Sequence, residues 1–507
     1  MSTLNKVYDI AIIGSGSLSQ VCAVLSQHYE LDTVLIKASE NESKNYDSLM
    51  LDDETMRLMN SIGVLENIGE DIFSPYFTDL ILPNGKVIQR NLVSITHNGY
   101  NQINFVNQNL LREALDTKII NSSNSYFTEK SELINFDYTN NIYELNLRLD
   151  NKLTKLKAHY LIVFDELNSI IKKFPTKIDD LKYNKDWLIV DLVTSQNNIL
   201  ENAFRQVCDP KRPTTQIVTS ENKCRFEFQL LAGENKNLFS TKDMIDELLK
   251  PFLGKDQYSV LNYFVKNFRG YYCKNIKFDG LFLAGDAAHK IPPYAGHNFN
   301  TGIRDILNLI WKIKLQHSSE FSTNILATYE TERLSQIKET IKSSIALGQL
   351  IDSMSMAYQK NISFEESIPP EAREQAFGDK SVAAQSWISN GLYHSDIDDT
   401  LLTKRLPKVS LMKDGVTCEL DEIIDFKFAI VSDQILNQEK LISGSEILQN
   451  LNIKFINLSE YSYSNDFLSE LIEVGSIIVR PDKKIFGVST SDLSIDKLLE
   501  DLANQLS

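Results

Sequence analysis

The chain has 507 residues and carries 52 Lys and Arg against 68 Asp and Glu, which gives a formal net charge of −16 at pH 7. That length predicts two or three domains, and the acidic charge argues against nucleic acid as a partner. No stretch approaches the ~18 apolar residues of a membrane-spanning helix, no signal-peptide pattern precedes the first strand, and the five widely spaced cysteines argue against a disulfide framework, so we expect a cytoplasmic protein.

A strand, a glycine-rich turn and a helix open the chain. The β-branched run Ile10–Ile13 meets Gly14 and Gly16, and an apolar helical pattern follows over Leu18–Leu25. Glycines in such a turn let the backbone approach a pyrophosphate, which binds the free N–H groups at the helix N-terminus. The layout therefore predicts a dinucleotide-binding unit.

Two positions depart from that motif. Ser19 stands where a third glycine is usual, and Lys37 stands at the end of the second predicted strand, 33–36, where an acidic residue would meet the ribose. Taken alone, a degenerate motif of this kind fits an ordinary strand-to-helix turn as well as a cofactor site.

The middle of the chain has a different pattern. Residues 158–173 contain a buried-strand pattern that ends at Asp165, which by itself predicts a strand and a surface turn. Polar and apolar residues alternate over 225–230, and 187–193 is a second strand candidate. We therefore expect an antiparallel sheet between residues ~175 and ~275, which could carry a second ligand.

The stretch 281–302 reads LFLAGDAAHKIPPYAGHNFNTG. Asp286 follows a short strand at its carboxyl end, where ligands bind in open α/β sheets. An ionised aspartate there can accept hydrogen bonds from a polyol such as a ribityl chain, and Pro292 and Pro293 stiffen the loop that follows.

A helix is predicted from Gly302 to about Leu315, directly after this loop. Gly296, Asn300 and Thr301 precede it and leave backbone N–H groups free at its N-terminus. Those groups and the helix dipole favour an electron-rich partner, such as the pyrimidine edge of a reduced flavin. A well-capped loop–helix junction without a ligand is the alternative.

The segment 285–313 closely resembles the second flavin-binding motif of the group A FAD-dependent aromatic hydroxylases, the p-hydroxybenzoate and phenol hydroxylase superfamily. Further segments resemble the branch of 3-(3-hydroxyphenyl)propionate hydroxylase, and the end of the chain resembles its C-terminal thioredoxin-like domain without a Cys-X-X-Cys motif. These further matches lie at residues 52–63, 99–115, 187–193, 208–215, 225–234, 327–334, 407–424, 426–432 and 475–489.

The resemblance implies an α/β fold. A Rossmann-like FAD-binding domain would hold an inserted antiparallel-sheet substrate domain and be followed by a thioredoxin-like domain. The implied boundaries are 1–174 and 276–395 for the FAD-binding domain, 175–275 for the substrate sheet and 396–507 for the C-terminal domain.

The resemblance also implies site residues. Arg225 and Tyr294 could be substrate neighbours or packing residues, and both alternatives stay open, whereas no catalytic acid or base and no metal ligand is implied. The cofactor-binding residues would be Gly14, Gly16, Ser17, Leu18, Lys37, Gln108, Asp165, Asp286, Pro293, Gly296, His297, Asn298, Phe299 and Asn300.

Several positions differ from the family pattern. Asp47 stands where an arginine is expected near the FAD phosphates, a reversal that should cost on the order of a few kcal/mol of FAD binding. Glu166 and Lys172 replace the glycine and terminal arginine of the motif that begins at Asp165, and Asn298 replaces a glycine of the ring-facing loop.

The activity implied is an FAD-dependent monooxygenase. NAD(P)H would reduce FAD, O₂ would give a C4a-hydroperoxyflavin, and a small aromatic or polyketide-like substrate would be hydroxylated. Baeyer–Villiger oxidation on the same fold stays open, as does a degenerate member that binds FAD weakly or not at all and acts as a non-catalytic binding or scaffold protein. A homodimer is compatible with the resemblance.

Overall fold

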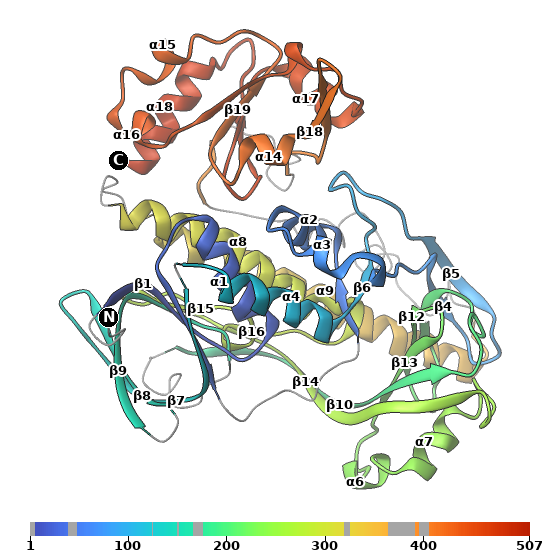
Figure 1. Ribbon diagram of the computed structural model, residues 1–507. Coiled ribbons are helices and arrows are strands. Elements are labelled where there is room, and N and C mark those ends of the chain that lie inside the picture. Colours follow the sequence, from blue (N-terminus) through green and yellow to red (C-terminus); the bar gives the residue numbers. More distant parts are fainter. Residues whose placement is uncertain are drawn as a thin grey trace.

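The structure is a computed structural model (Figure 1). It describes residues 6–38, 48–123, 125–149, 152–165, 176–318, 325–362, 391–394 and 405–507. Asp47, Glu166 and Lys172, three of the departures noted above, lie outside the described residues.

A six-stranded sheet forms the first layer of the molecule. Its centre is parallel: β1 (Val7–Ile13) lies between β2 (Thr33–Ala38) and β9 (Lys152–Val163), and β15 (Leu281–Leu283) pairs with the other edge of β9. Residues 10–13 of β1 and 161–163 of β9, at the carboxyl ends of the two strands, are buried, as expected of parallel strands covered on both faces. The parallel pairing brings the carboxyl ends of β1 and β15 to the same edge of the sheet.

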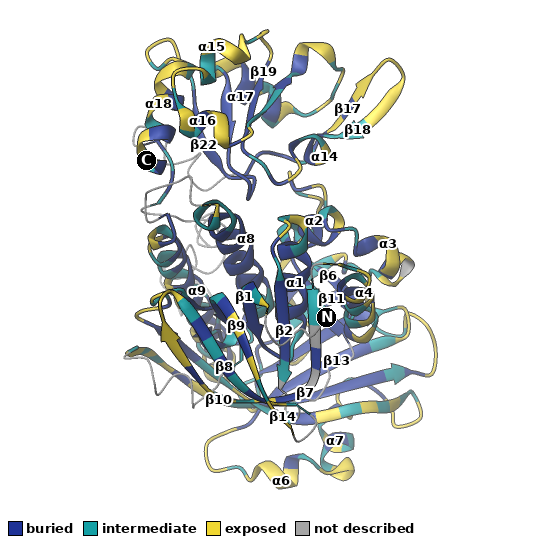
Figure 2. Ribbon diagram, turned by 60° about the vertical axis from the view of Figure 1, so that its left-hand side comes forward, coloured by how far each residue is buried: buried dark blue, intermediate teal, exposed yellow. Residues whose placement is uncertain are grey.

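Helices and a hairpin complete this domain. α1 (Ser17–His28) and α4 (Gln108–Ile120) pack side by side, and α8 (His297–His317) crosses α1 (Figure 1). β7 (Ser125–Thr139) and β8 (Ile142–Leu149) are antiparallel neighbours that extend the sheet. Both α1 and α8 are buried along most of their length (Figure 2). The predicted strand–turn–helix opening of the chain is confirmed.

The start of α8 corrects one prediction. The helix begins at His297 rather than Gly302, so Asn300 and Thr301 lie inside its first turns. The Thr301 hydroxyl donates to the His297 carbonyl at 2.8 Å, one turn back along the helix. The positions of glycine and proline in the sequence do not predict this hydrogen bond. The left-handed conformation of Gly296, with φ of 62°, immediately precedes the helix.

A second, eight-stranded sheet lies beside the first domain (Figure 1). Its central strands are antiparallel and fall between residues 175 and 275, as predicted. The sheet is wider than predicted, because two strands from 77–92 extend one edge and the short strand at 289–290 extends the other. Its order is β16 (His289–Lys290), β14 (Tyr258–Cys273), β10 (Ile178–Thr194), β13 (Lys223–Gln229), β12 (Thr214–Ser220), β11 (Ala203–Val207), β4 (Phe77–Ile81) and β5 (Val87–Leu92).

The two faces of this sheet have different roles. Leu188, Val190, Phe226 and Phe228 form one apolar cluster with the short helices α6 (Lys236–Phe239) and α7 (Lys242–Leu249), on the outer side (Figure 1). Side chains alternate along a strand, so the intervening residues point to the opposite face, towards the first domain. On that inner face Trp187 contacts Tyr294 of the loop before α8.

The C-terminal residues form a separate four-stranded sheet of order β20-β19-β21-β22. β19 pairs parallel with β20 and antiparallel with β21. Its assignment as a thioredoxin-like domain stays a prediction. The elements are β17 (Ser410–Lys413), β18 (Val416–Glu419), α14 (Leu420–Ile424), β19 (Ala429–Ser432), α15 (Gln438–Ile442), α16 (Glu446–Asn450), β20 (Lys454–Asn457), α17 (Asp466–Val474), β21 (Ile477–Val479), β22 (Ile485–Val488) and α18 (Ile495–Leu506).

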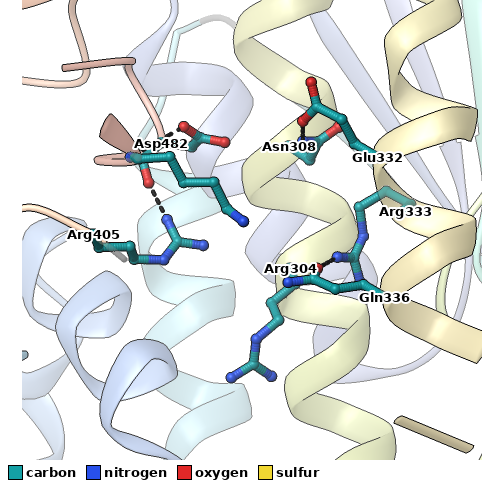
Figure 3. A pocket seen from close by; sticks show the side chains of 8 residues that line it. Arg304, Asn308, Glu332, Arg333, Gln336, Arg405 and Asp482 are labelled. Carbon is teal, nitrogen blue, oxygen red and sulfur yellow. Dashed lines mark hydrogen bonds between the residues drawn. The ribbon is translucent and has the colours of Figure 1, made fainter. Parts of the chain in front are cut away.

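Buried ion pairs join this domain to the helices below it. Glu332 of α9 (Ala327–Lys360) lies 2.8 Å from Arg480 and 3.2 Å from Lys312 of α8, and all three side chains are at most 1% exposed. Arg304 and Arg405, together with Glu332, line a gap beside these pairs that is too narrow to hold a water molecule (Figure 3). Among the helices that the structure describes, none combines the length and the apolar character needed to cross a membrane.

Candidate cofactor site

The glycine-rich turn lies between β1 and α1, and its two glycines differ. A Cβ on Gly14 would lie 2.8 Å from the Ser19 Cβ and 3.0 Å from the Phe164 Cβ, so close packing requires this glycine. A Cβ on Gly16 would meet no atom within 4 Å. Gly16 is the N-cap residue of α1 and makes no side-chain cap, so open space lies directly at a helix N-terminus.

Ser19, at the third glycine position, is accommodated by the turn. Its side chain is fully buried, and its hydroxyl lies 3.0 Å from the Gly14 carbonyl and 2.7 Å from the Gly16 carbonyl, to either of which it can donate. Leu18 reaches from the same turn towards the β15–α8 region, where a Cβ on Gly285 or Gly302 would lie 2.9 or 2.5 Å from its Cδ1. The departure at Ser19 therefore leaves the geometry of the turn intact.

Asp165 closes the turn from the end of β9. The Ser15 backbone N–H and hydroxyl both donate to its Oδ2, each at 2.9 Å. Burial raises the pKa of Asp165, and the Ser15 hydrogen bonds oppose that rise. Arg112 of α4 donates to the Ser15 carbonyl at 3.3 Å, so three separate segments meet at this turn.

Lys37 lies near the end of β2, and its side chain reaches α4. Its Nζ lies 3.1 Å from the Asp116 carboxylate, which also accepts from Gln20 at 2.6 Å. The lysine that replaces the expected acidic residue thus has an acidic partner on the neighbouring helix. Its placement holds β2 and α4 together at the edge of the site.

Three buried polar side-chain atoms in the first turns of α1 and α4 have no hydrogen-bond partner among the described residues. They are the Ser17 Oγ and the Gln20 Oε1 of α1 and the Gln108 Oε1, on the first residue of α4. An unsatisfied buried polar atom costs roughly 1–3 kcal/mol, so native structures pair such atoms with a neighbour, water or ligand. Together with the open space at Gly16, these atoms fit a polar, phosphate-bearing ligand such as FAD.

Asp286 follows β15 at the same sheet edge. Its Oδ2 lies 2.6 Å from the Lys290 Nζ, and its Oδ1 accepts from the Asn298 side chain at 2.7 Å. Burial by itself would raise the pKa of Asp286, but Lys290 and Lys266 outweigh it and bring the pKa to about 2. The carboxylate is therefore ionised near neutral pH, and 40% of the side chain stays exposed.

The loop from Pro293 to Asn300 continues into α8. Gly296 has a left-handed conformation, with φ of 62°, which strains any side chain there, and a Cβ would also lie 2.7 Å from the Met50 Sδ. The Asn300 amide is committed to the protein: it donates to the Gly296 carbonyl and accepts from the Thr55 hydroxyl. Phe299 is half-buried against the main core.

His297 is the first residue of α8. Burial, together with the positive charge of Arg304, lowers its pKa to about 4 against the opposing effect of Asp52. The imidazole is therefore neutral at pH 7. His289, two residues after the Gly285–Ala287 turn, is fully buried, and its Nε2 lies 2.9 Å from Asp305.

The two residues predicted as substrate neighbours lie at the inner face of the large sheet. Arg225 forms an ion pair with Asp191, with 2.7 Å between the Arg225 Nε and the Asp191 Oδ1. Tyr294 is 1% exposed, packs edge-on against Trp187, and its hydroxyl accepts a hydrogen bond from the Tyr183 hydroxyl at 3.4 Å. Tyr294 is thus a packing residue between the loop and the sheet in this structure.

Sequence reasoning missed Lys290, Lys266 and Arg112. Lys290 follows Asp286 by four residues, a spacing that signals an ion pair on a helix, but no helix was predicted there. Lys266 acts on Asp286, and Arg112 donates to the Ser15 carbonyl, in both cases from a distant part of the sequence. No local pattern predicts these contacts.

Asp286→Ala should weaken FAD binding roughly tenfold to a hundredfold. The substitution removes an ionised acceptor, and a hydrogen bond to a charged group contributes roughly 1.5–3 kcal/mol. Equilibrium titration of the FAD-free variant with FAD measures the effect. Asp279→Ala, an exposed aspartate before the same strand, is the matched control and should bind FAD as the unaltered protein does. Equal affinity of both variants would contradict this placement of Asp286.

Comparisons with known proteins agree with this geometry. Residues 7–344, more than half of the chain, match the family model described as FAD binding domain. The chain is 23% identical over 359 residues to 3-(3-hydroxy-phenyl)propionate/3-hydroxycinnamic acid hydroxylase of Burkholderia cenocepacia, a match that covers 70% of this chain and 65% of the relative. A probable NADH-specific resorcinol 4-hydroxylase of Rhodococcus jostii is 22% identical over 525 residues, 98% of this chain and 95% of that protein.

Solved structures share the fold over the whole chain. The flavin-dependent monooxygenase PieE, in complex with FAD and substrate, superposes with a TM-score of 0.80 at 14% identity, covering 99% of both chains. Aklavinone-11 hydroxylase, in a ternary complex with FAD and aklavinone, gives a TM-score of 0.75 at 14% identity and covers 99% of this chain. The match to the Burkholderia relative spans just under two thirds of that protein's length. On the family match, this chain belongs to the FAD-binding domain family.

Proposed function

We propose that the protein is an FAD-dependent monooxygenase that uses NAD(P)H and O₂ to hydroxylate a small aromatic or polyketide-like substrate. The observation that carries the proposal is that the open helix N-terminus at Gly16 and the ionised Asp286 lie at one sheet edge, joined by Asp165, which accepts from Ser15 and is within electrostatic reach of Asp286. Their chemistry suits a pyrophosphate and a ribityl chain respectively. The unpartnered Gln108 Oε1, on the first residue of α4, would suit a contact with the flavin.

Each part of the site has a proposed task. The turn from Gly14 to Leu18 would hold the pyrophosphate through backbone N–H groups, and Asp165 would fix that turn through Ser15. Asp286 would accept from the ribityl hydroxyls, and the loop from Pro293 to Asn300 would border the flavin ring. Bound FAD supplies electron transfer from the nicotinamide and activation of O₂, whereas the protein orients the reactants and excludes water.

The inner face of the large sheet is the proposed substrate surface. It combines apolar side chains such as Trp187 with polar ones such as Gln206, whose Oε1 accepts from the Thr215 hydroxyl at 2.9 Å. Pockets for small molecules are mostly apolar with a few placed polar groups. Relatives named for hydroxylating 3-(3-hydroxyphenyl)propionate, resorcinol and aklavinone support a phenolic substrate class.

A coupled assay tests the proposal. Purified protein with added FAD is supplied with NADH or NADPH, O₂ and one of a panel of phenols that includes resorcinol and 3-(3-hydroxyphenyl)propionate. Nicotinamide oxidation, O₂ uptake and hydroxylated product are measured separately. Substrate-stimulated nicotinamide oxidation with a product one oxygen heavier supports the proposal. Bound FAD without nicotinamide oxidation or product from any phenol would contradict it.

One observation favours a second candidate, a family member that keeps the fold as a binding protein without FAD. Both carboxylate oxygens of Asp286 are already engaged, one by Lys290 and one by Asn298, the residue that replaces the family glycine. A ribityl chain must share or displace these partners. The affinity for FAD therefore distinguishes the two candidates directly.

Two further proposals concern the cellular compartment and the oligomeric state. The reducing cytoplasm is the compartment proposed, since all five cysteines are free and Cys22, Cys208, Cys224 and Cys273 are buried. A homodimer is the assembly proposed for this family member, and light scattering of the purified protein measures it.

A further inference from the structure

A row of side chains crosses the inner face of the large sheet. Glu227 of β13 stands directly opposite Ile189 of β10 on one side and Thr215 of β12 on the other. Thr215 in turn stands opposite Gln206 of β11. Directly opposite residues in a sheet point to the same face, so Glu227 lies in the middle of the proposed substrate surface.

The contacts of the Glu227 carboxylate differ from those of its neighbour on the same strand. Arg225, two residues earlier, is ion-paired with Asp191 at 2.7 Å. Within the part of the chain that the structure describes, no hydrogen bond or ion pair engages the Glu227 carboxylate. The residue is 9% exposed, so a small molecule on this face can reach it. A buried carboxylate without a partner is costly for the fold, which favours a functional reason for it.

Charged groups from the surrounding strands act on Glu227. Burial raises its pKa to about 7, Arg225 and Lys266 oppose that rise, and Asp191 adds to it. Lys266, on β14 opposite Trp187, also acts on Asp286, and Glu227 raises the pKa of Tyr183. Glu227 therefore acts directly on Tyr183, whose hydroxyl donates to Tyr294 of the loop before α8, and it shares Lys266 with Asp286.

We propose that Glu227 is the proton acceptor for the hydroxyl group of a phenolic substrate. This role rests on the proposed function. The phenol O–H bond breaks, its electron pair stays on the phenolate oxygen, and the proton forms an O–H bond with a carboxylate oxygen of Glu227. The negative charge moves from the carboxylate to the substrate, so the total charge of the site is unchanged.

The chemistry of aromatic hydroxylation explains why such an acceptor is useful. An oxygen atom delivered as an electrophile attacks an electron-rich ring, and a phenolate ring is richer in electrons than a phenol ring. A general base works best when its pKa lies near the working pH, and such a group contributes roughly 10²–10⁴-fold to rate. A carboxyl group with an ordinary pKa would be a weaker base for this task.

Glu227→Gln in the full-length, FAD-loaded protein tests the role. The amide keeps the size of the side chain but cannot take up the proton. We expect hydroxylated product from the phenols of the panel to fall roughly a hundredfold, while substrate-stimulated nicotinamide oxidation continues and yields hydrogen peroxide. Aniline counterparts of the same phenols, which lose no proton to become electron-rich, should be hydroxylated at rates within about a factor of two of the unaltered protein.

Two variants serve as controls. Glu221→Gln, an exposed glutamate at the turn between β12 and β13, should leave every rate unchanged. Glu227→Asp keeps the carboxylate and should recover part of the lost rate. In the unaltered protein, the rate of product formation should rise with pH through a midpoint near pH 7 as Glu227 ionises. In Glu227→Gln, the rate should not rise through this pH range.

A second readout needs neither cofactor nor substrate. Since the pKa of Glu227 is raised in the folded state, the folded protein binds more protons than the unfolded chain between the ordinary carboxyl pKa and about 7. The unaltered protein should therefore lose Tm relative to Glu227→Gln as pH rises through that window. Equal Tm differences at pH 5 and pH 8 would contradict the raised pKa.

The outcomes separate the two claims. If the unaltered protein hydroxylates phenols and Glu227→Gln does so equally well, the role of Glu227 is overturned and the proposed function stands. If Glu227→Gln hydroxylates neither phenols nor anilines, Glu227 is a structural residue and the proposed role is again wrong. If the unaltered, FAD-loaded protein hydroxylates no phenol, the proposed function fails and this role with it.

Discussion

We expect Gly16→Val to weaken FAD binding at least about a hundredfold, on the order of 3 kcal/mol, while leaving the Tm of the FAD-free protein unchanged. No atom lies within 4 Å of a Cβ at this position, and the backbone there is extended, with φ of −93° and ψ of 171°, which valine adopts readily. The free fold therefore accommodates the side chain. A bound pyrophosphate must approach this same backbone, so the valine excludes it.

Gly14→Ala is the matched control with the opposite result. The added methyl group would lie 2.8 Å from the Ser19 Cβ and 3.0 Å from the Phe164 Cβ. Overpacking of this kind costs roughly 1–3 kcal/mol of folding stability. Thermal unfolding and FAD titration of both variants give the comparison. Gly16→Val with unaltered FAD affinity would show that the turn does not hold the pyrophosphate.

Glu332→Ala should reduce the free energy of unfolding by roughly 3–5 kcal/mol. The carboxylate is fully buried and faces Arg480 at 2.8 Å and Lys312 at 3.2 Å, and it also accepts from the Leu392 N–H at 2.9 Å. Removing it leaves two buried cations without their shared anion, which is far costlier than loss of a surface pair. Because Arg480 belongs to the C-terminal domain, the variant also weakens the contact between that domain and α9.

Urea unfolding at pH 7 measures this loss. Glu339→Ala, a 42% exposed glutamate on the same helix paired with Lys342, should change the unfolding free energy by less than about 1 kcal/mol. Burial would raise the pKa of Glu332, but Arg480 and Lys312 hold it well below its usual range. The stabilisation is therefore complete above the ordinary carboxyl pKa and is lost as pH falls below it. A change under 1 kcal/mol for Glu332→Ala would contradict the account of this interface.

Short-range patterns predicted the parts of the site that depend on neighbouring residues. The turn at Gly14 and Gly16 and the strand that ends before Asp286 each follow from a run of apolar residues that meets small or acidic ones. The resemblance at 285–313 added the ring-facing loop. The start of α8 was misplaced because Asn300 and Gly302 are typical of helix ends. Here tertiary hydrogen bonds hold Asn300 inside the helix, and Gly302 packs closely against Leu18.

Long-range contacts could not be predicted from the sequence. The strand 77–81 joins the large sheet by parallel pairing with 203–207, and no local signal specifies such a partner. The Ser15–Asp165 hydrogen bonds also join residues far apart in the sequence, and no local pattern predicts them. Asn298 was identified only as a departure from the family glycine, yet its side chain donates to Asp286 and so shapes the acceptor that we assign to the ribityl chain.

The central claim is that this fold holds FAD at the edge of the first sheet. Titration of the purified, FAD-free protein with FAD, followed by flavin fluorescence and by the oxidised-flavin absorbance after gel filtration, tests it most directly. The account predicts saturable binding of one FAD per chain that stays with the protein, and loss of that binding in Gly16→Val. If the unaltered protein and Gly16→Val both stay colourless and take up no FAD, the account is contradicted.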